Sequence, residues 1–270
     1  MRYGFIGLGN MGSSLAAGLL DSGAVSPGFT VVANRSLVKA QSFARRYPGV
    51  TVAESNLIAA EGSDTLFVAV RTDQLLGVLK EVSSAGKHAH VVVVNGAIPL
   101  PLLEKVCRSP VSRLIPSVTM ERGRGVSLLS HGPSVSAPQA RRLQEALGRA
   151  SMVIAVQEDK MDAAADLTSC GPALIAETMR QFAEAGVRRG LDPNQAWEMV
   201  LETMQGAALA LTSGESVASL KEKVATRGGI TEQGLLVLEA ELPAVFDKVM
   251  DRTLAKHAEV RERLMKDIGP

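Results

Sequence analysis

The sequence predicts an α/β fold in which a doubly wound parallel sheet is followed by an all-helical domain. Three observations predict it. Short apolar runs alternate with helical patterns through residues 1–157, the strand pattern almost disappears from residue 158 onward, and a glycine-rich turn joins the first apolar run to the first helical pattern. We therefore expect one domain at residues 1–157 and a second, helical domain at residues 158–270.

The apolar runs of the first half have the composition of buried parallel strands. They are apolar almost throughout rather than at every second position, which is typical of strands covered by helices on both faces. The expected strands are Tyr3–Ile6, Phe29–Ala33, Thr65–Val70, Ala89–Val94, Val111–Pro116 and Met152–Val156, with Val126–Leu129 as a candidate for one more. The helices expected between them are Ser13–Leu20, Leu37–Arg46, Gln74–Val82, Leu100–Val106 and Pro138–Leu147.

The second half shows helical periodicity and almost no strand pattern. Met161–Arg189 has the pattern of one long helix, perturbed at Gly171-Pro172, and Gly190 is a natural stop after it. A proline in the first turn after Asp192 marks the start of the next helix. The helices expected from there on are Pro193–Thr212, Ser216–Val224, Thr231–Glu241 and Pro243–Met265.

These helices carry apolar residues on more than one face. Examples are Leu201, Met204, Ala207, Ala208 and Leu211. A helix that is apolar over a wide arc must be buried, and so short a domain has too little surface of its own to cover it. We therefore expect residues 161–270 to build a homodimer or a higher homo-oligomer.

The composition argues against several kinds of partner. The chain has 270 residues and a formal net charge of +1, so nothing suggests a nucleic-acid or membrane partner. No apolar run reaches the ~20 residues needed to cross a bilayer, and the chain begins directly with a strand rather than a signal peptide. With only two cysteines, Cys107 and Cys170, a reducing cytoplasm is the expected compartment.

No metal site is expected, because the candidate ligands lack metal-ligand spacing. The two cysteines lie far apart in the sequence, and the four histidines are scattered along it. We expect these histidines at the surface: His88, His90, His131 and His257.

Gly7, Gly9 and Gly12 form a GxGxxG between the first strand and the first helix. Gly7 permits a tight turn, Gly9 lets the backbone approach a pyrophosphate, and Gly12 lets the helix pack closely on the strand. The pyrophosphate then lies at the helix N-terminus, where free N–H groups favour an anion. We therefore expect a Rossmann-type dinucleotide site that includes Asn10 and Met11; the alternative is a glycine-rich turn that only packs the unit.

The end of the second strand indicates which dinucleotide is bound. NAD-specific sites usually carry an acidic residue there, about 20 residues after the glycines, to bind the ribose hydroxyls. Here the strand ends in Asn34-Arg35-Ser36, which has no carboxylate to repel a 2′-phosphate. Arg35 can pair with that phosphate, and Asn34 and Ser36 can donate hydrogen bonds, so NADP(H) is the expected cofactor. The alternative is a solvated arginine beside a helix-capping serine.

A second glycine-rich loop precedes a helix late in the chain. It contains Thr226, Gly228 and Gly229, and Thr231 lies near the start of the following helix. Exposed N–H groups and a hydroxyl in this arrangement can hold a substrate carboxylate. The same residues can equally form a simple helix cap, and geometry alone leaves both interpretations open.

The whole chain resembles the pyrroline-5-carboxylate reductase family. The late motif of that family is similar to Val224–Thr231, and the other matching segments are Gly7–Gly12, Asn34-Arg35-Ser36, Ala69-Val70-Arg71 and Ser169–Ala173. The resemblance implies a Rossmann domain, a helical C-terminal domain that interlocks with a partner subunit, and NAD(P)H-dependent reduction of a cyclic imine to proline.

The resemblance also assigns roles to individual residues. It implies a substrate-binding loop in which Thr231 approaches the imine nitrogen, and it adds cofactor contacts beyond the first glycine motif. The implied substrate-binding residues are Thr226, Arg227, Gly228, Gly229 and Thr231, with Thr231 as the catalytic residue. The implied further cofactor-binding residues are Val70, Arg71, Asn95, Gly96 and Ser117.

Three positions depart from the family pattern, all in expected active-site loops. Ser117 stands where the family has an asparagine that helps to place the nicotinamide, and Arg227 stands where it has a proline. The segment Val94–Ala97 replaces the family's Ala-Ala-Gly. These departures bear on the exact substrate and on the activity, and leave the expected fold unchanged.

Two other functions fit parts of the sequence. A β-hydroxyacid dehydrogenase has a similar opening, but it needs a lysine as acid and base at an alcohol, and the stretch after Lys160, Asp162–Arg180, contains no lysine and no asparagine. Reducing an imine needs no strong base, so the absence favours imine chemistry. A non-catalytic dinucleotide-binding regulator is the second alternative, and the altered loop at Ser117 supports it.

Overall fold

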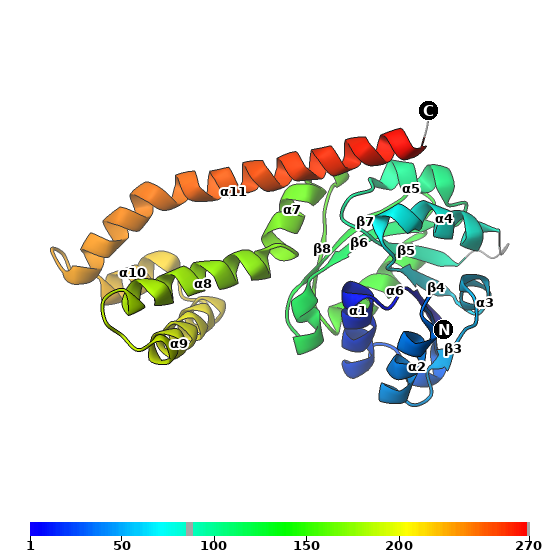
Figure 1. The fold of residues 1–270 in the computed structure, drawn as a ribbon, viewed down its shortest axis with the longest axis horizontal. Coiled ribbons are helices and arrows are strands. Elements are labelled where there is room, and N and C mark those ends of the chain that lie inside the picture. Colours follow the sequence, from blue (N-terminus) through cyan, green and yellow to red (C-terminus); the bar gives the residue numbers. More distant parts are fainter. Residues whose placement is uncertain (85–88, 269–270) are drawn as a thin grey trace. The chain divides into compact units, whose positions relative to one another are not determined.

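A computed structural model describes residues 1–84 and 89–268 of the chain. By their internal contacts these residues form two compact units (Figure 1). The first unit joins Met1–Cys170 to the end of the chain from Leu254 onward, and the second is Gly171–Thr253. The expected division into a dinucleotide-binding domain at residues 1–157 and a helical domain at residues 158–270 remains a prediction.

The first unit is built on a mostly parallel sheet. In the described part of the chain it has eight strands in the order β3-β2-β1-β4-β5-β6-β7-β8. The strands are β1 (Tyr3–Ile6), β2 (Thr30–Ala33), β3 (Thr51–Val52), β4 (Thr65–Val68), β5 (His90–Val94), β6 (Val111–Pro116), β7 (Val126–His131) and β8 (Met152–Ala155). The expected strands are therefore all present, and the two-residue β3 is the only described strand that the apolar runs do not predict.

The sheet is parallel, as expected, except at one place. β7 runs antiparallel to β6, and β8 is parallel to β7. The reason is the short connection after Pro116, which holds only a 3₁₀ turn, η2 (Val118–Arg122), before Val126. A parallel crossover needs a dozen or more residues, so this connection returns the chain beside the strand it has just left.

Helices cover both faces of the sheet, as the expected doubly wound fold requires. They are α1 (Asn10–Asp21), α2 (Leu37–Arg46), α3 (Asn56–Glu61), α4 (Thr72–Ser83), α5 (Leu100–Val106), α6 (Ala137–Gly148) and α7 (Met161–Thr168), with 3₁₀ turns η1 (Pro27–Phe29) and η3 (Glu158–Lys160). Adjacent residues of β1 pack into different hydrophobic clusters. Phe5 stacks on Phe67 in one cluster, whereas Ile6 packs in the other. This confirms strands buried on both faces.

The second unit is helical. It contains α8 (Gly171–Val187), α9 (Pro193–Thr212), α10 (Val217–Val224) and most of α11 (Ile230–Ile268), whose last part belongs to the first unit. The break between α7 and α8 lies just before Gly171-Pro172, where the long helix expected at Met161–Arg189 was predicted to be perturbed. One expectation is wrong: the helices expected at Thr231–Glu241 and Pro243–Met265 form a single helix, because Pro243 lies inside α11 without ending it. A proline removes one ladder donor, and the long helix on either side of Pro243 tolerates this loss.

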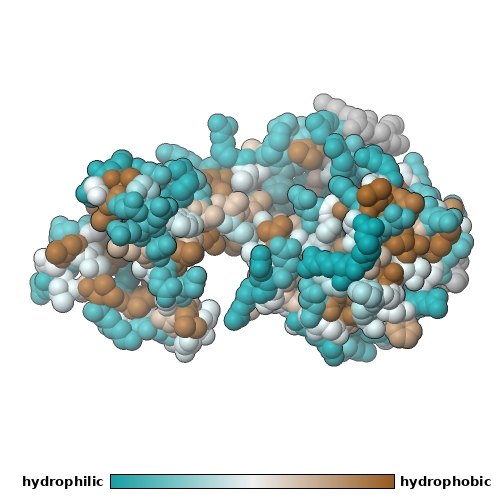
Figure 2. Space-filling view, turned by 60° about the horizontal axis from the view of Figure 1, so that its bottom comes forward, coloured by the Kyte–Doolittle hydropathy of each residue, from teal (hydrophilic) through white to brown (hydrophobic). Residues whose placement is uncertain are grey.

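The second unit has a small core and many exposed apolar side chains. Its buried cluster consists of Ala183, Ala196 and Val200. Large side chains on all four helices are exposed, and hydrophobic residues reach the surface in Figure 2 as well. Among them are Ile175, Phe182, Met199, Leu209, Val217, Ile230 and Val237. So large an exposed apolar surface is typical of an interface with another chain.

The histidines do not all lie at the surface, as the sequence led us to expect. His90 is 1% exposed and bonds Ser112, which also bonds the half-buried His131. His257 lies on α11 and contacts Asp166, and His88 lies outside the described residues.

Among the helices of the described residues, none is long and apolar enough to cross a membrane. Within the same part of the chain, no three His, Cys, Asp or Glu side chains are grouped so that they could hold a metal ion.

Candidate functional site

The turn between β1 and α1 needs glycine at two of its three glycine positions. Gly7 has φ +93°, and a Cβ there would lie 2.5 Å from the carbonyl oxygen of Ala69. A Cβ on Gly12 would collide with the carbonyl oxygen of Gly7. Around Gly9 nothing lies within 4 Å of the position that a Cβ would take. Gly7 and Gly12 therefore build the turn, while Gly9 leaves open space in front of the N-terminus of α1, where a pyrophosphate can approach.

A cavity of about 570 Å³ opens beside this turn, at the carboxyl ends of β1, β2 and β4. This is the edge at which open α/β sheets bind ligands. Of the predicted cofactor residues, those lining the cavity are Gly7, Gly9, Asn34, Arg35, Ser36, Val70 and Arg71. The structure thus brings together residues from three separate segments of the sequence. The cradle, with its open space at Gly9, fits a dinucleotide.

Asn34 and Ser36 both line the cavity, but their side chains have different hydrogen bonds. The Oδ1 atom of Asn34 accepts a hydrogen bond from the Leu8 N–H at 2.9 Å, and its Nδ2 donates to the Ser36 carbonyl at 3.0 Å. Asn34 therefore ties the glycine turn to the loop after β2. Ser36 occupies the N-cap position of α2, but its hydroxyl makes no capping hydrogen bond. That hydroxyl is therefore available to a ligand.

Lys39 is a cavity residue that the sequence analysis missed. It lies in the first turn of α2, exposed, and lines the same cavity as Arg35. Together they place two positive charges at the end of β2, where a 2′-phosphate would lie. The signal in the sequence is a basic residue four positions after Arg35. Arg71 also lines the cavity, and its Nε bonds Asp73 at 3.1 Å.

Three predicted cofactor residues at the start of α1 do not line this cavity: Asn10, Met11 and Gly12. Asn10 is exposed at the start of α1 and lines a neighbouring groove of about 680 Å³. Met11 is half-buried and packs against the core, and Gly12 is buried at the contact with the turn. Their roles at a cofactor remain predictions.

Three predicted cofactor residues lie in loops that do not line the cavity. Asn95 is 9% exposed and its side-chain amide is used internally: Oδ1 accepts from the Ala97 and Ile98 N–H groups, and Nδ2 donates to Thr72. The Gly96 carbonyl accepts a hydrogen bond from a buried arginine of β6. The Ser117 side chain is also buried, with its hydroxyl 2.8 Å from that of Thr119. Direct contact of these residues with a nicotinamide remains a prediction.

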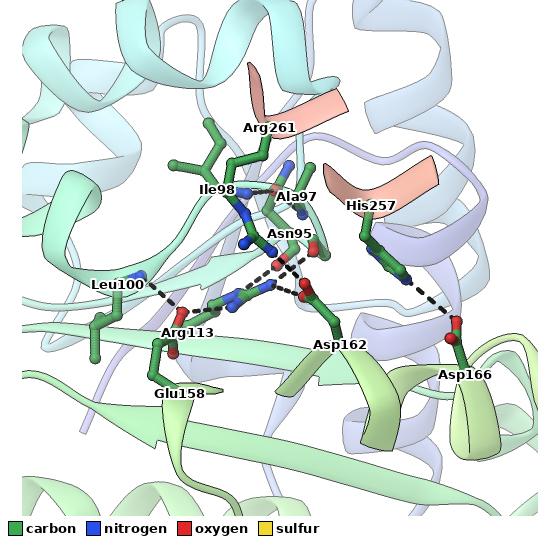
Figure 3. Close-up of polar contacts among 11 residues, drawn as sticks. Asn95, Ala97, Ile98, Leu100, Arg113, Glu158, Asp162, Asp166, His257 and Arg261 are labelled. Carbon is green, nitrogen blue, oxygen red and sulfur yellow. Dashed lines mark hydrogen bonds and ion pairs between the residues drawn. The ribbon is translucent and has the colours of Figure 1, made fainter. Parts of the chain in front are cut away.

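That arginine, Arg113, is the second residue that the sequence analysis missed. It lies within the apolar strand β6 and is 1% exposed. Figure 3 shows its guanidinium between the Asn95 carbonyl and the carboxylates of Glu158 and Asp162. A single charge inside a run of apolar residues is the signal that could have found it, because isolated charges are rarely buried without partners.

The late glycine loop lies in the second unit, between α10 and α11. Gly228 has φ +73°, and its N–H donates to the Glu232 side chain at 2.6 Å. The Gly229 N–H donates to the Thr226 carbonyl at 2.8 Å. Thr231 is exposed in the first turn of α11, and Arg227 is exposed in the loop. The carboxylate of Glu232 shows that this loop binds an oxygen anion, although here the anion belongs to the chain itself.

Comparisons with known proteins agree with both halves of this description. Residues 2–97 match the family model "NADP oxidoreductase coenzyme F420-dependent", and residues 158–260 match "Pyrroline-5-carboxylate reductase dimerisation". The first match supports a nicotinamide cofactor, and the second supports oligomerisation.

Individual relatives span nearly the whole chain. It is 31% identical to pyrroline-5-carboxylate reductase 3 of Danio rerio over 243 residues, covering 88% of this chain and 84% of that one. It is 28% identical to ComE operon protein 4 of Bacillus subtilis, covering 96% of each. A pyrroline-5-carboxylate reductase from Coxiella burnetii superposes with a TM-score of 0.88 at 29% identity, covering 96% of this chain and 98% of that one. The chain belongs to the pyrroline-5-carboxylate reductase family and is an NAD(P)H-dependent oxidoreductase acting on a C=N bond.

Proposed function

We propose that the protein reduces a carboxylated cyclic imine with NADPH, with 1-pyrroline-5-carboxylate as substrate and L-proline as product. The observation that carries the proposal is the loop Thr226–Gly229 followed by Thr231, exposed in the first turn of α11. Backbone N–H groups of this loop bind the carboxylate, in the way that Gly228 already binds Glu232. Glu232 then has to give way to the substrate.

The residues of the chain have a modest chemical task in this reaction. When bound, the nicotinamide supplies the hydride that adds to the imine carbon while the C=N electron pair moves to nitrogen. The loop fixes the carboxylate and thereby the ring. The Thr231 hydroxyl donates a hydrogen bond to the nitrogen as charge develops there, and solvent supplies the proton. Orientation is the main contribution, since holding two reactants in place can supply up to ~7–11 kcal/mol of the barrier.

The decisive experiment measures the turnover of a panel of substrates by the purified protein. NADPH oxidation is followed with 1-pyrroline-5-carboxylate, its six-membered homologue and the ring without the carboxylate, and NADP⁺ reduction is followed with a β-hydroxyacid. We expect turnover with the carboxylated imines and little with the bare ring. Turnover of the β-hydroxyacid alone would favour the dehydrogenase alternative. Binding of NADPH with no imine turnover would favour a regulatory role.

Replacing Thr231 by alanine should lower kcat by about tenfold or more, because a hydrogen bond to the developing nitrogen charge is lost. Binding of NADPH should be unchanged, because Thr231 lies in the other unit from the dinucleotide cavity. Steady-state kinetics and NADPH titration check both parts. Thr231→Ser, which keeps the hydroxyl, should retain most of the activity. Full activity in Thr231→Ala would remove this residue from the site.

We also propose that NADPH is preferred over NADH. Arg35, Ser36 and Lys39 surround the end of β2, where no acidic residue stands to bind the ribose hydroxyls of NADH. The acidic residues of the cavity, Glu54 and Glu81, come from other segments.

Arg35→Ala should weaken NADPH binding by about 10- to 150-fold, the equivalent of about 1.5–3 kcal/mol for a charge-assisted contact, and leave NADH binding nearly unchanged. Arg45 offers a matched control, because it is an exposed arginine of α2 that bonds Ser42 and does not line the cavity. Arg45→Ala should bind both cofactors as the parent does. Equal affinity of the unmodified protein for NADPH and NADH would contradict the preference.

We propose, finally, a cytoplasmic homodimer, or a higher oligomer built from it, formed by residues 161–270. The exposed apolar side chains of α8, α9 and α11 support this interface. Sedimentation at micromolar concentration should show no folded monomer, and replacing Phe182 and Leu209 by glutamate should dissociate the assembly, because both side chains are more than half exposed in the single chain. Val38→Glu, on α2 of the first unit, is the control and should leave the assembly intact. A stable parent monomer would contradict the proposal.

A further inference from the structure

Arg113 carries a positive charge inside the buried strand β6. Its side chain is 2% exposed and lies in the centre of β6, where the neighbouring residues Leu114 and Ile115 belong to the cores. An apolar residue at such a position is often as stabilising as a buried ion pair or more so. We therefore look for the reason for this buried charge in the groups that the Arg113 guanidinium binds.

The guanidinium holds the turn that follows β5. Its Nε donates to the Asn95 carbonyl at 3.1 Å, and its Nη2 donates to the Gly96 carbonyl at 2.6 Å. Two successive carbonyls are thus fixed by one planar group, which only an arginine can do with this geometry. The side chain of Asn95 fixes the rest of the turn through the Ala97 and Ile98 N–H groups.

The turn is also bonded to the rim of the dinucleotide cavity. The Nδ2 atom of Asn95 donates to the Thr72 hydroxyl at 3.1 Å. Thr72 is the first residue of α4, and the residue before it, Arg71, lines the cavity. The turn stands at the carboxyl end of β5, next to the end of β4, so it borders the region beyond the strands where a ligand binds.

On its other side the guanidinium is fixed by two acids. Its Nη1 bonds Glu158 at 2.5 Å, and the same carboxylate oxygen accepts the Leu100 N–H at the start of α5. Asp162, in the first turn of α7, forms an ion pair with Nη2 at 3.5 Å. Asp162 also pairs with Arg261 on the last part of α11. One turn away along each helix, Asp166 contacts His257 at 3.2 Å, so α7 and α11 meet through two polar pairs (Figure 3).

We infer that Arg113 is a positioning residue for the cofactor: it sets the Asn95–Ile98 turn against the nicotinamide half of the dinucleotide. The Asp162–Arg261 pair ties this setting to the last part of α11, which belongs to the same unit. The inference rests on the proposed function, in that a nicotinamide is placed beside the turn. It explains why a charge is kept inside β6.

The test separates the two halves of the cofactor. Binding of 2′,5′-ADP reports on the adenosine half, which the 570 Å³ cavity receives, and the fluorescence of bound NADPH reports on the surroundings of the nicotinamide. Arg113→Lys keeps the charge but cannot bond both carbonyls and Glu158 at once. We expect unchanged 2′,5′-ADP affinity, a changed fluorescence of bound NADPH, and a kcat lowered by about tenfold or more, with a smaller change in the KM for the imine.

Two further variants keep the test decisive. Arg261→Met removes the Asp162–Arg261 pair, keeps the Asp166–His257 pair and every contact of Arg113, and should alter the NADPH fluorescence in the same direction by a smaller amount. It stands in for Arg113→Lys if that variant does not fold. Arg108→Met, an exposed arginine near the start of β6, is the control and should behave as the parent. Unchanged NADPH fluorescence in the folded variants, or an equal loss of affinity for 2′,5′-ADP and NADPH, would overturn the inference. If no imine is reduced at all, the fluorescence and 2′,5′-ADP results still decide it.

Discussion

Gly12→Ala is expected to destabilise the first unit by about 3 kcal/mol and to remove dinucleotide binding with it. The added methyl group would collide with the carbonyl oxygen of Gly7 and lie 3.0 Å from the Ala69 Cβ. Neither the turn nor the start of α1 can yield without separating β1 from the helix that covers it. Urea denaturation measures the loss of stability, and NADPH titration measures the loss of binding.

Gly9→Ala is the matched control, because it adds the same methyl group at a position where the methyl group meets no other atom of the chain. Nothing lies within 4 Å of the added Cβ, and φ −74° at Gly9 suits any residue. Its stability should equal that of the parent. Its NADPH affinity should fall by about tenfold or more, since the methyl group takes the space of the approaching pyrophosphate. If Gly9→Ala bound NADPH as the parent does, the pyrophosphate would not lie at Gly9. If Gly12→Ala were as stable as the parent, the turn would be able to relax around the added methyl group.

The same glycines show what sequence patterns can predict. The order Gly-x-Gly-x-x-Gly between a strand and a helix fixes a local geometry, and the structure confirms it at Gly7 and Gly12. Strands such as Thr65–Val68 were likewise predictable, because burial on both faces leaves an apolar run. In contrast, a two-residue strand such as Thr51–Val52 has no period to detect. The direction of β7 depends on the length of its connection and not on its own residues.

The part of the candidate site that the backbone forms, the glycine turn, was predictable from the sequence. The part that side chains form was less predictable. Asn34 and Asn95 have the same side chain, and both are bonded to backbone groups of the chain itself, although both were expected at the cofactor. A sequence does not distinguish an amide that binds a ligand from one that closes a turn. Arg113 went unnoticed for the related reason that its partners, Glu158 and Asp162, are far along the chain and meet it only in the fold.

Acid is expected to destabilise the protein through a pair of histidines. They lie at the amino ends of the parallel strands, whereas the cavity lies at the carboxyl ends. His90 begins β5 and His131 ends β7, and the Ser112 hydroxyl lies 2.7 Å from a ring nitrogen of each. Burial lowers the pKa of His90 to about 4, with the nearby His131 and Arg142 adding to the effect. Burial also lowers the pKa of His131. The folded protein therefore keeps the His90 ring neutral well below the usual pKa of histidine, ~6.5.

The direction of the effect follows from which state binds the proton. Between pH ~6.5 and ~4 the unfolded chain takes up a proton at position 90 that the folded chain excludes, so stability is lost as the pH falls through this window. Above pH ~6.5 both states are neutral and nothing is lost. The loss due to His90 amounts to about 3 kcal/mol in full, and about 2 kcal/mol of it is reached at pH 5.

His90→Gln tests this, because glutamine can still bond Ser112 but does not titrate. The free energy of unfolding, measured by urea denaturation at pH 7 and pH 5, should fall less in His90→Gln than in the parent by about 2 kcal/mol. Each protein serves as its own reference, so any constant cost of the substitution cancels. Ser112→Ala, which removes the shared hydroxyl and keeps both rings, should retain most of the acid effect, since burial is its main cause. Parallel curves for the parent and His90→Gln would mean that the His90 ring takes up its proton in the folded protein as readily as in the unfolded chain.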